Sequence, residues 1–394
     1  MPNIMVLGLA GQQPYIAGGF GDDVGNPKNS RYSRASESDN RVNSISAIEP
    51  RPGYRISSII RGHSTHAEAR RGMDSTATLA DLTAFVDVGI TTIDCDTGDP
   101  GFERLVGSLL QDLRQTRGSD VVQSLRIHTK FVPDLSSPGA FSESQVESAV
   151  DQAIARLGVD ALDLVQLHWP IPDTSACLDA LGYLTMMQAK GKISHLGVTN
   201  FDADHLGMLI KSGFDIITAQ VQFSLIDQRP KGDFADLCRQ HNIALLASGT
   251  LAGGFLSQRW LGAPDPGYTF QAPMLARHRL VIEAFGGWGL FQELLLALAG
   301  IAARHGITLE SVALRAMHDH ADIAAVVLRT SLADQLPDRL KAFNFAPTER
   351  DREALAAVLA KKQGPYGPVF GIERENTDHR GRLTTAKLGR SKRL

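Results

Sequence analysis

Short apolar runs alternate with longer amphipathic segments from residue 54 onward, a pattern typical of repeated β/α units. Eight apolar runs predict strands over residues 56–60, 91–93, 124–129, 162–167, 194–198, 216–222, 243–247 and 324–328. Segments with helical spacing predict helices over residues 77–88, 101–115, 144–157, 178–189, 202–211, 231–240 and 332–342, and one more over residues 310–318 before the last strand. Eight units, most of them spaced by about 20 to 40 residues, favour a (β/α)8 TIM barrel over a doubly wound sheet.

The two ends of the chain and one internal stretch depart from this pattern. Residues 1–52 are rich in polar residues and glycine without any period, which predicts a disordered leader. The barrel is expected over residues 53–363, and the basic residues 364–394 are expected to form a disordered tail. Residues 253–288 carry proline, glycine and aromatic residues after the seventh strand, which predicts an irregular lid or mobile loop over the barrel mouth.

Composition and charge limit the possible partners. A formal charge of −3 gives no indication of a nucleic acid partner, and no apolar stretch approaches the length of about 18 to 20 residues that a membrane span needs. Cys95, Cys177 and Cys238 lie far apart without CxxC pairs, so neither disulfides nor a zinc site is predicted. A reducing, cytoplasmic location is the expectation that follows.

The loop after the second predicted strand carries three carboxylates, within the segment TTIDCDTGDPGFERLVG. Asp94, Asp96 and Asp99 lie where a barrel strand ends, and barrels keep their reactive groups at that end. Carboxylate oxygens also suit Mg²⁺ or Ca²⁺, but a nearby lysine competes for their charge, so no metal site is predicted.

Polar side chains follow four further predicted strands. Asp94, Lys130, His168, Asn200 and Gln220 lie at the carboxyl ends of strands two to six, so we expect them to converge on one pocket. A lysine beside Asp94 would hold this carboxylate ionised. His168, at the end of LDLVQLHWP, has the chemistry to hydrogen-bond a polarised carbonyl or to transfer a proton.

Five segments resemble the aldo-keto reductase superfamily in order and spacing: GITTIDCD, IHTKFVPD, VDALDLVQLHWP, ISHLGVTNF and LASGTLAGGFLSQRWLG. The resemblance covers roughly residues 54–361. It implies a barrel that binds NADP(H) without a Rossmann motif. In such a barrel, the bound NADPH transfers a hydride to a small-molecule carbonyl. It also implies a tetrad of aspartate, tyrosine, lysine and histidine, in which the tyrosine protonates the developing alkoxide.

This chain departs from the tetrad at one position. The resemblance places Asp94, Lys130 and His168 in the tetrad, but Asp99 stands where the family has its tyrosine. A carboxylic acid beside a lysine is ionised near neutral pH, so Asp99 is expected to accept protons where a phenol would donate them.

The residues that resemble the family's cofactor site are partly retained. Thr199, Asn200 and Gln220 match the positions that hold the nicotinamide carboxamide, and the loop 250–262 matches the pyrophosphate loop, with Thr250, Leu251 and Gly253 as the expected contacts. Ser248 replaces the aromatic residue that stacks on the nicotinamide. After the eighth strand, Arg329 and Ser331 replace the glycine and arginine that bind the adenosine phosphate, and Arg329 still suits a phosphate.

Three functions remain open on the sequence. The first is an NADP(H)-dependent reductase in which Lys130, His168 or a water replaces the tyrosine as proton donor. The second is a non-redox dehydratase, isomerase or cyclase, with Asp99 as base, and the third is a pseudoenzyme that binds cofactor or a partner without turnover. Aromatic residues predicted near the mouth suggest an apolar or aromatic substrate, namely Phe131, Trp169, Trp260 and Trp288.

Overall fold

Eight parallel strands close into a barrel in the computed structural model, which confirms the predicted (β/α)8 architecture. The structure describes residues 45–63, 75–95, 100–133, 142–169, 174–270, 273–328 and 336–375. The barrel strands are hydrogen-bonded in the order β10-β3-β4-β5-β6-β7-β8-β9. Their bounds are β3 Ile59–Gly62, β4 Thr92–Asp94, β5 Arg126–Phe131, β6 Leu162–His168, β7 Ile193–Thr199, β8 Ile216–Gln222, β9 Ala244–Ser248 and β10 Ala325–Leu328.

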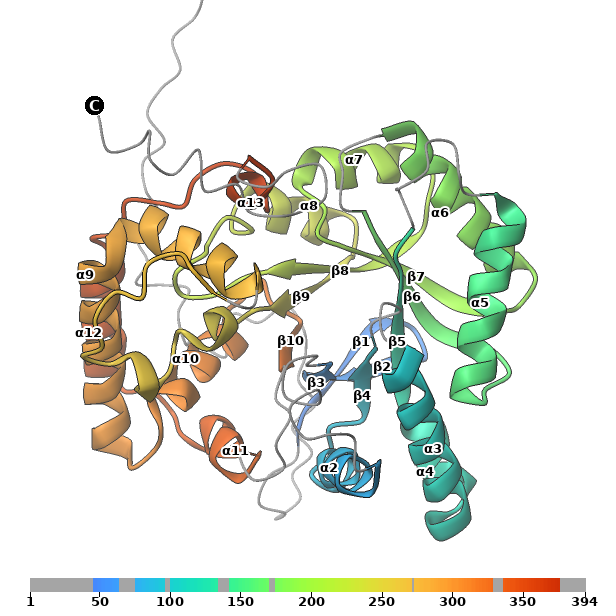
Figure 1. Cartoon of the computed structure of the whole chain (residues 1–394), viewed down its shortest axis with the longest axis horizontal. Helices are drawn as coiled ribbons and strands as arrows, with labels where there is room; N and C mark the ends of the chain where they lie inside the picture. Colours follow the sequence, from blue (N-terminus) through green and yellow to red (C-terminus); the bar gives the residue numbers. More distant parts are fainter. Residues whose placement is uncertain are drawn as a thin grey trace, which may run out of the picture.

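Helices surround the strands (Figure 1). Their bounds are α2 Ser75–Asp87, α3 Pro100–Arg117, α4 Ser119–Ser124, α5 Glu143–Leu157, α6 Thr174–Ala189, α7 Ala203–Lys211, α8 Asp233–Gln240, α9 Pro273–His305, α10 Leu309–His318, α11 Leu336–Asn344, α12 Glu349–Leu359 and α13 Gly371–Glu375. The sequence sets these limits locally. Helix α5, for example, begins with a capping box between Ser142 and Gln145 and ends at Gly158, whose φ of 65° is left-handed.

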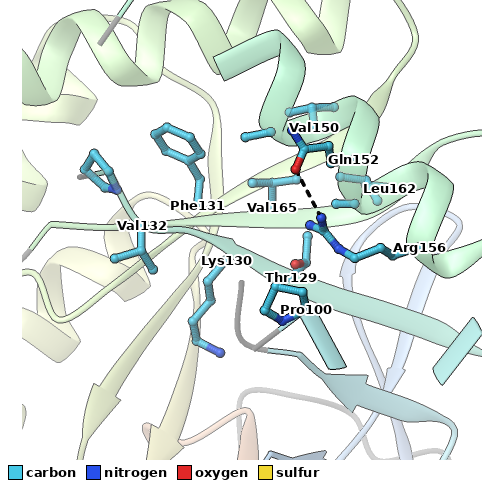
Figure 2. A pocket seen from close by; sticks show the side chains of 13 residues that line it. Pro100, Thr129, Lys130, Phe131, Val132, Val150, Gln152, Arg156, Leu162 and Val165 are labelled. Carbon is cyan, nitrogen blue, oxygen red and sulfur yellow. Dashed lines mark hydrogen bonds between the residues drawn. The ribbon is translucent and has the colours of Figure 1, made fainter. Parts of the chain in front are cut away.

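Alternation along each strand divides the apolar residues into two cores. Successive side chains of a strand point to opposite faces, and on β5 Lys130 points away from the face on which Phe131 lies (Figure 2). Outward residues such as Phe131 and Val165 pack with the helices in the larger core, the outer core. Inward residues such as Leu164 and Leu246 form a smaller core inside the barrel, the inner core. The polar inward positions described below therefore face the barrel interior.

A hairpin closes the barrel at the amino-terminal ends of the strands. Strands β1, Ala47–Arg51, and β2, Tyr54–Ser57, pair antiparallel, and Ile48 and Tyr54 pack with the inner core. Strand β1 lies inside the predicted leader 1–52, so that boundary was placed too late. The predicted strand 56–60 was also inaccurate, because this range spans the end of β2 and the start of β3. Residues 1–44 lie outside the described part of the chain.

The predicted lid over residues 253–288 is wrong for the most part. The segment contains two short 3₁₀ turns, η2 Ala252–Gly254 and η3 Gln258–Trp260, and then enters the long helix α9. Helix α9 is kinked at Gly286 and Gly287, whose φ values of 142° and 79° disfavour other residues. Its apolar residues had no β/α partner in the expected repeat, and they instead extend the outer core.

Helix α9 also corrects the expectation that no apolar stretch reaches the length of a membrane span. Its residues Met274–His305 form the one helix, among those described, with sufficient length and mean hydropathy, 1.4 over its most apolar window. Several of its side chains are fully buried in the outer core, including Phe285, Phe291 and Leu298. Helix α9 packs against α10 and α12, and 39% of its most apolar window is buried.

The carboxyl-terminal part of the chain holds a second correction. Residues 364–394 were predicted as a disordered tail, but helix α13, Gly371–Glu375, lies within them and Glu373 is 3% exposed. Its partners are on the loops after β7 and β8, which a reading of local composition does not reveal. Residues 376–394 lie outside the described part, so for them the tail stays a prediction.

Candidate active site

An ion pair between Asp94 and Lys130 lies at the centre of the candidate site. Asp94 ends β4 and Lys130 lies near the end of β5, and both side chains point into the barrel. The Lys130 Nζ donates to Asp94 Oδ2 at 2.6 Å and to the carbonyl oxygen of Cys95 at 3.2 Å. The two side chains are 2% and 6% exposed, so the pair is largely shielded from water and from screening by salt. The sequence prediction that these two residues meet is confirmed.

Two side-chain amides complete the coordination of Asp94. Gln166 Nε2 donates to Oδ1 at 2.9 Å and Gln220 Nε2 donates to Oδ2 at 3.0 Å. Burial opposes ionisation of Asp94, but Lys130, His128 and the hydrogen bond from Gln220 outweigh it and keep the pKa of Asp94 below its usual value. Because both oxygens of Asp94 already accept hydrogen bonds, this carboxylate is poorly suited to bind a metal ion.

A second polar pair joins the ends of β6 and β7. Asn200 Nδ2 lies 3.0 Å from His168 Nε2, and Thr199 Oγ1 donates to Gln220 Oε1 at 3.3 Å. With the Asn200 amide as donor, His168 Nε2 accepts, and the ring proton of His168 is on Nδ1. Gln220 thus connects the two pairs, since it contacts both Asp94 and Thr199. The structure therefore brings Asp94, Lys130 and Gln220 together and joins His168 to Asn200, whose backbone N–H donates to the Gln220 carbonyl oxygen. That all five side chains line one pocket stays a prediction.

Asn200 has a left-handed backbone, with a φ of 66°. Asparagine tolerates this region better than most residues, which explains its use directly after a strand. Its amide nitrogen donates to the carbonyl oxygen of Gln220 at 3.0 Å. This turn directs the Asn200 side chain back over the end of β6, toward His168.

The sequence analysis missed His128, which lies inside the barrel one inward position before Lys130. His128 is fully buried, and neither ring nitrogen has a hydrogen-bond partner among the described residues. Burial lowers the pKa of His128 to about 4, although the Asp94 carboxylate opposes this shift. The only signal for His128 in the sequence was a histidine next to apolar residues of a predicted strand. Histidines that merely pack in a core show the same pattern.

The pKa of His128 leads to a pH-dependence prediction. The pKa of His128 is lower in the folded than in the unfolded state, so the unfolded chain binds a proton first as the pH falls. The stability that neutral His128 provides is therefore present above pH 6.5 and is lost toward pH 4. We expect about 3 kcal/mol of this loss from His128 alone. Urea unfolding at several pH values should show a flatter profile for His128→Leu than for wild type, whereas His241→Leu, at an exposed position, should not change the slope. An unchanged slope in His128→Leu would contradict the assignment.

Part of the predicted cofactor site follows β9. Ser248 ends this strand, and Thr250, Leu251 and Gly253 lie in the turn that follows, where Thr250 is 2% exposed. Ser248 pairs in register with Gln222 of β8, which places this turn beside the Gln220 strand. The structure therefore places these residues at the carboxyl end of β9, beside β8, and their role in binding a cofactor stays a prediction.

A histidine from α9 packs against this turn. A Cβ at Gly253, where φ is 64°, would lie 2.5 Å from the His278 ring, and one at Gly249 would lie 3.3 Å from it. Glycine is therefore required at Gly253 both by the backbone and by the neighbouring ring. Packing of helix α9 thus accounts for glycine at Gly253, and the contact of Gly253 with a pyrophosphate stays a prediction.

Four predicted site residues lie outside the described part of the chain: Asp96, Asp99, Arg329 and Ser331. Their roles stay predictions. Cys95, which precedes the first two, is fully buried, and its carbonyl oxygen accepts a hydrogen bond from Lys130.

A cavity of about 440 Å³ lies on the outer side of β5 and β6, next to α5. Phe131, Val150 and Val165 line it, and Arg156 approaches it from α5 (Figure 2). Among its described lining residues, only Lys130 belongs to the polar pairs. This cavity lies between the strands and the helices, so it is distinct from the barrel interior that holds Asp94.

The four aromatic residues predicted to lie near the barrel mouth pack in or against the outer core. Phe131 and Trp169 are buried in the outer core, and Trp260 and Trp288 pack against each other and against Phe255. These side chains stabilise the packing of helices on the barrel. The apolar or aromatic character of the substrate stays a prediction.

A closed (β/α)8 barrel with ionisable side chains gathered at the carboxyl ends of its strands has its site where barrel enzymes have theirs. The chain belongs to the aldo/keto reductase family, since the model of that family matches residues 58–360.

Two relatives are similar to this chain over more than half of its length. Flagellar radial spoke protein 5 of Chlamydomonas reinhardtii is 32% identical over 265 residues, which cover 59% of this chain and 50% of that protein. An aldo-keto reductase of Mycolicibacterium smegmatis is 26% identical over 227 residues, which cover 57% of this chain and 68% of that protein. The chain thus matches only half the length of the first of these relatives.

A solved structure shares the fold. The aldo-keto reductase of Bombyx mori in complex with NADP has a TM-score of 0.59 and is 18% identical, covering 81% of this chain and 94% of that chain. At this level of identity the likeness concerns the barrel alone.

Proposed function

We propose that this family member catalyses the NADP(H)-dependent reduction of a small-molecule carbonyl, with a proton donor other than tyrosine. The buried Asp94–Lys130 pair carries this proposal. An ammonium group held by a carboxylate at the strand ends provides positive charge where an alkoxide would develop. The family assignment, and the NADP that the Bombyx mori protein binds, support a nicotinamide cofactor.

The side chains near this pair fit the carboxamide end of such a cofactor. Thr199, Asn200 and Gln220 offer a hydroxyl and two amides, and each amide has a hydrogen-bonding group left over after its contacts in the structure. The bound cofactor would supply the hydride.

Lys130 is the proposed proton donor. Its ammonium group has three N–H donors, and the described residues accept two of them, at Asp94 and Cys95. The third is available for a substrate oxygen, and it stabilises negative charge there before it transfers the proton. His168 is less suited to donate the proton while its Nε2 accepts a hydrogen bond from Asn200. Its proposed role is to orient the substrate carbonyl.

A cofactor titration tests this proposal. Binding of NADPH, followed by its fluorescence, should be saturable and about tenfold weaker in Asn200→Ala, because one hydrogen-bonding amide is lost. Asn242→Ala is the matched control, since Asn242 also has a positive φ, 55°, but lies in the turn between α8 and β9. Equal losses in both variants, or no NADPH binding by wild type, would overturn the proposal.

A binding protein without turnover is the second candidate. It is favoured by Asp99 in the place of the tyrosine and by a relative named as a radial spoke protein. This candidate predicts tight NADPH binding without oxidation of NADPH in the presence of diverse aldehydes and ketones. Steady turnover with any of these carbonyls would exclude it.

A further inference from the structure

Helix α13 contacts the loops that follow two strands of the candidate site. It lies beside α7 and α8 in the view of Figure 1, far along the chain from β7 and β8. Arg374 Nη2 donates to the carbonyl oxygen of Asn200 at 2.8 Å, and Arg374 Nη1 donates to Asp202 Oδ2 at 2.9 Å. One guanidinium therefore holds both sides of the turn that carries Asn200.

This contact acts on a backbone that is costly to maintain. Asn200 has a φ of 66°, and a residue in the left-handed region reverts to a negative φ unless its surroundings hold it. Its peptide is held at the nitrogen by the Gln220 carbonyl and at the oxygen by Arg374. The direction of the Asn200 side chain, and so its contact with His168, depends on this peptide.

A buried ion cluster fixes α13 in place. Glu373 binds Arg229 through Nη1 at 2.8 Å and Nη2 at 2.7 Å, and Arg229 also binds Asp227 at 2.7 Å. The three side chains are 4%, 1% and 1% exposed. Gln222, at the end of β8, donates to Asp227 Oδ2 at 2.9 Å. This cluster attaches α13 to the end of the barrel at which Asn200 lies, and it thereby fixes the backbone from which Arg374 extends.

We propose that Arg374 is a positioning residue of the candidate active site, which sets the orientation of Asn200 and, through it, of His168. This inference rests on the proposed function. Arg374 acts through Asn200 and does not itself touch the reacting atoms. Loss of its guanidinium lets the Asn200 peptide relax, which moves the amide away from His168 and from the position of the nicotinamide carboxamide.

The test compares Arg374→Met with two other variants. Arg374→Lys keeps a positive charge and should retain part of the contact. Arg304→Met is the matched control, because Arg304 binds Asp351 at 2.5 Å between two helices, with 36% of its side chain exposed. Arg374→Met should weaken NADPH binding and lower kcat about tenfold each, with Arg374→Lys intermediate and Arg304→Met unchanged. An equal loss of Tm in Arg374→Met and Arg304→Met, with NADPH binding unchanged in both, would overturn the proposal.

A second measurement separates this proposal from the function itself. The ¹⁵N resonances of the His168 ring, assigned by their loss in His168→Gln, report whether Nε2 accepts a hydrogen bond. They should shift in Arg374→Met without any cofactor present and stay unchanged in Arg304→Met. If wild type fails to bind NADPH but this shift occurs, the positioning role stands and the proposed reductase fails. If NADPH binds and the shift is absent, the positioning role fails.

Discussion

Replacing Asp99 by tyrosine should raise NADPH-dependent carbonyl reduction by about 10²- to 10⁴-fold, the usual contribution of a positioned general acid. The reason is that Lys130 and Asp94 already form the ion pair beside which a phenol would have its pKa lowered. Rates of NADPH oxidation with a panel of aldehydes and ketones would measure the gain.

Two other variants make this result specific. Asp96→Tyr places the same side chain in the same loop and should leave the rate near that of wild type. Asp99→Asn should leave a Lys130-dependent reductase largely active, whereas it should abolish a non-redox reaction that uses Asp99 as its base. A rate that does not rise in Asp99→Tyr, in protein that binds NADPH normally, would show that the carbonyl and the new phenol do not meet.

Lys130→Met should lower the free energy of unfolding by about 3 to 5 kcal/mol, because it leaves the Asp94 carboxylate buried without its cation. The double variant Lys130→Met with Asp94→Asn removes both charges and should recover most of the loss. Chemical denaturation at neutral pH measures both values. A double variant no more stable than Lys130→Met would show that lost packing, and not an unpaired charge, causes the effect.

The pH dependence of Lys130→Met provides an independent check. In wild type the pKa of Asp94 lies below its unfolded value, so its contribution is present at neutral pH and is lost only as the pH falls through the folded pKa. Without Lys130, burial raises the pKa of Asp94, and protonation then relieves the unpaired charge. The difference in stability between wild type and variant should therefore shrink from pH 7 toward about pH 4.

The barrel was predictable because its strands are short apolar runs at regular intervals, and each of the eight was found within a few residues of its expected place. Non-periodic parts were harder to predict. The hairpin β1–β2 and helix α13 depend on distant partners, such as Leu164 for Tyr54 and Arg229 for Glu373. Local composition at these segments is polar, so their order comes from tertiary contacts that a linear reading does not contain.

The site was predictable to a similar extent. Residues at strand ends, such as Asp94 and Gln220, share one barrel mouth as a consequence of parallel strand geometry. Gln166 and His128 were missed because each lies inside a strand, where the sequence does not show which face a side chain takes. The face of Phe131 could not be read from the sequence for the same reason: it lies one position after Lys130 and so points outward.

The ion cluster of Asp227, Arg229 and Glu373 has a consequence for the synthesis of this protein. Its first two members leave the ribosome well before the third, which lies 144 positions after Arg229. Until Glu373 emerges, Arg229 and Asp227 of the nascent barrel lack their third partner, and the ion cluster beyond the end of β8 cannot form. Translation of the segment around Glu373, and any delay there, would therefore decide when this half of the barrel reaches its mature form.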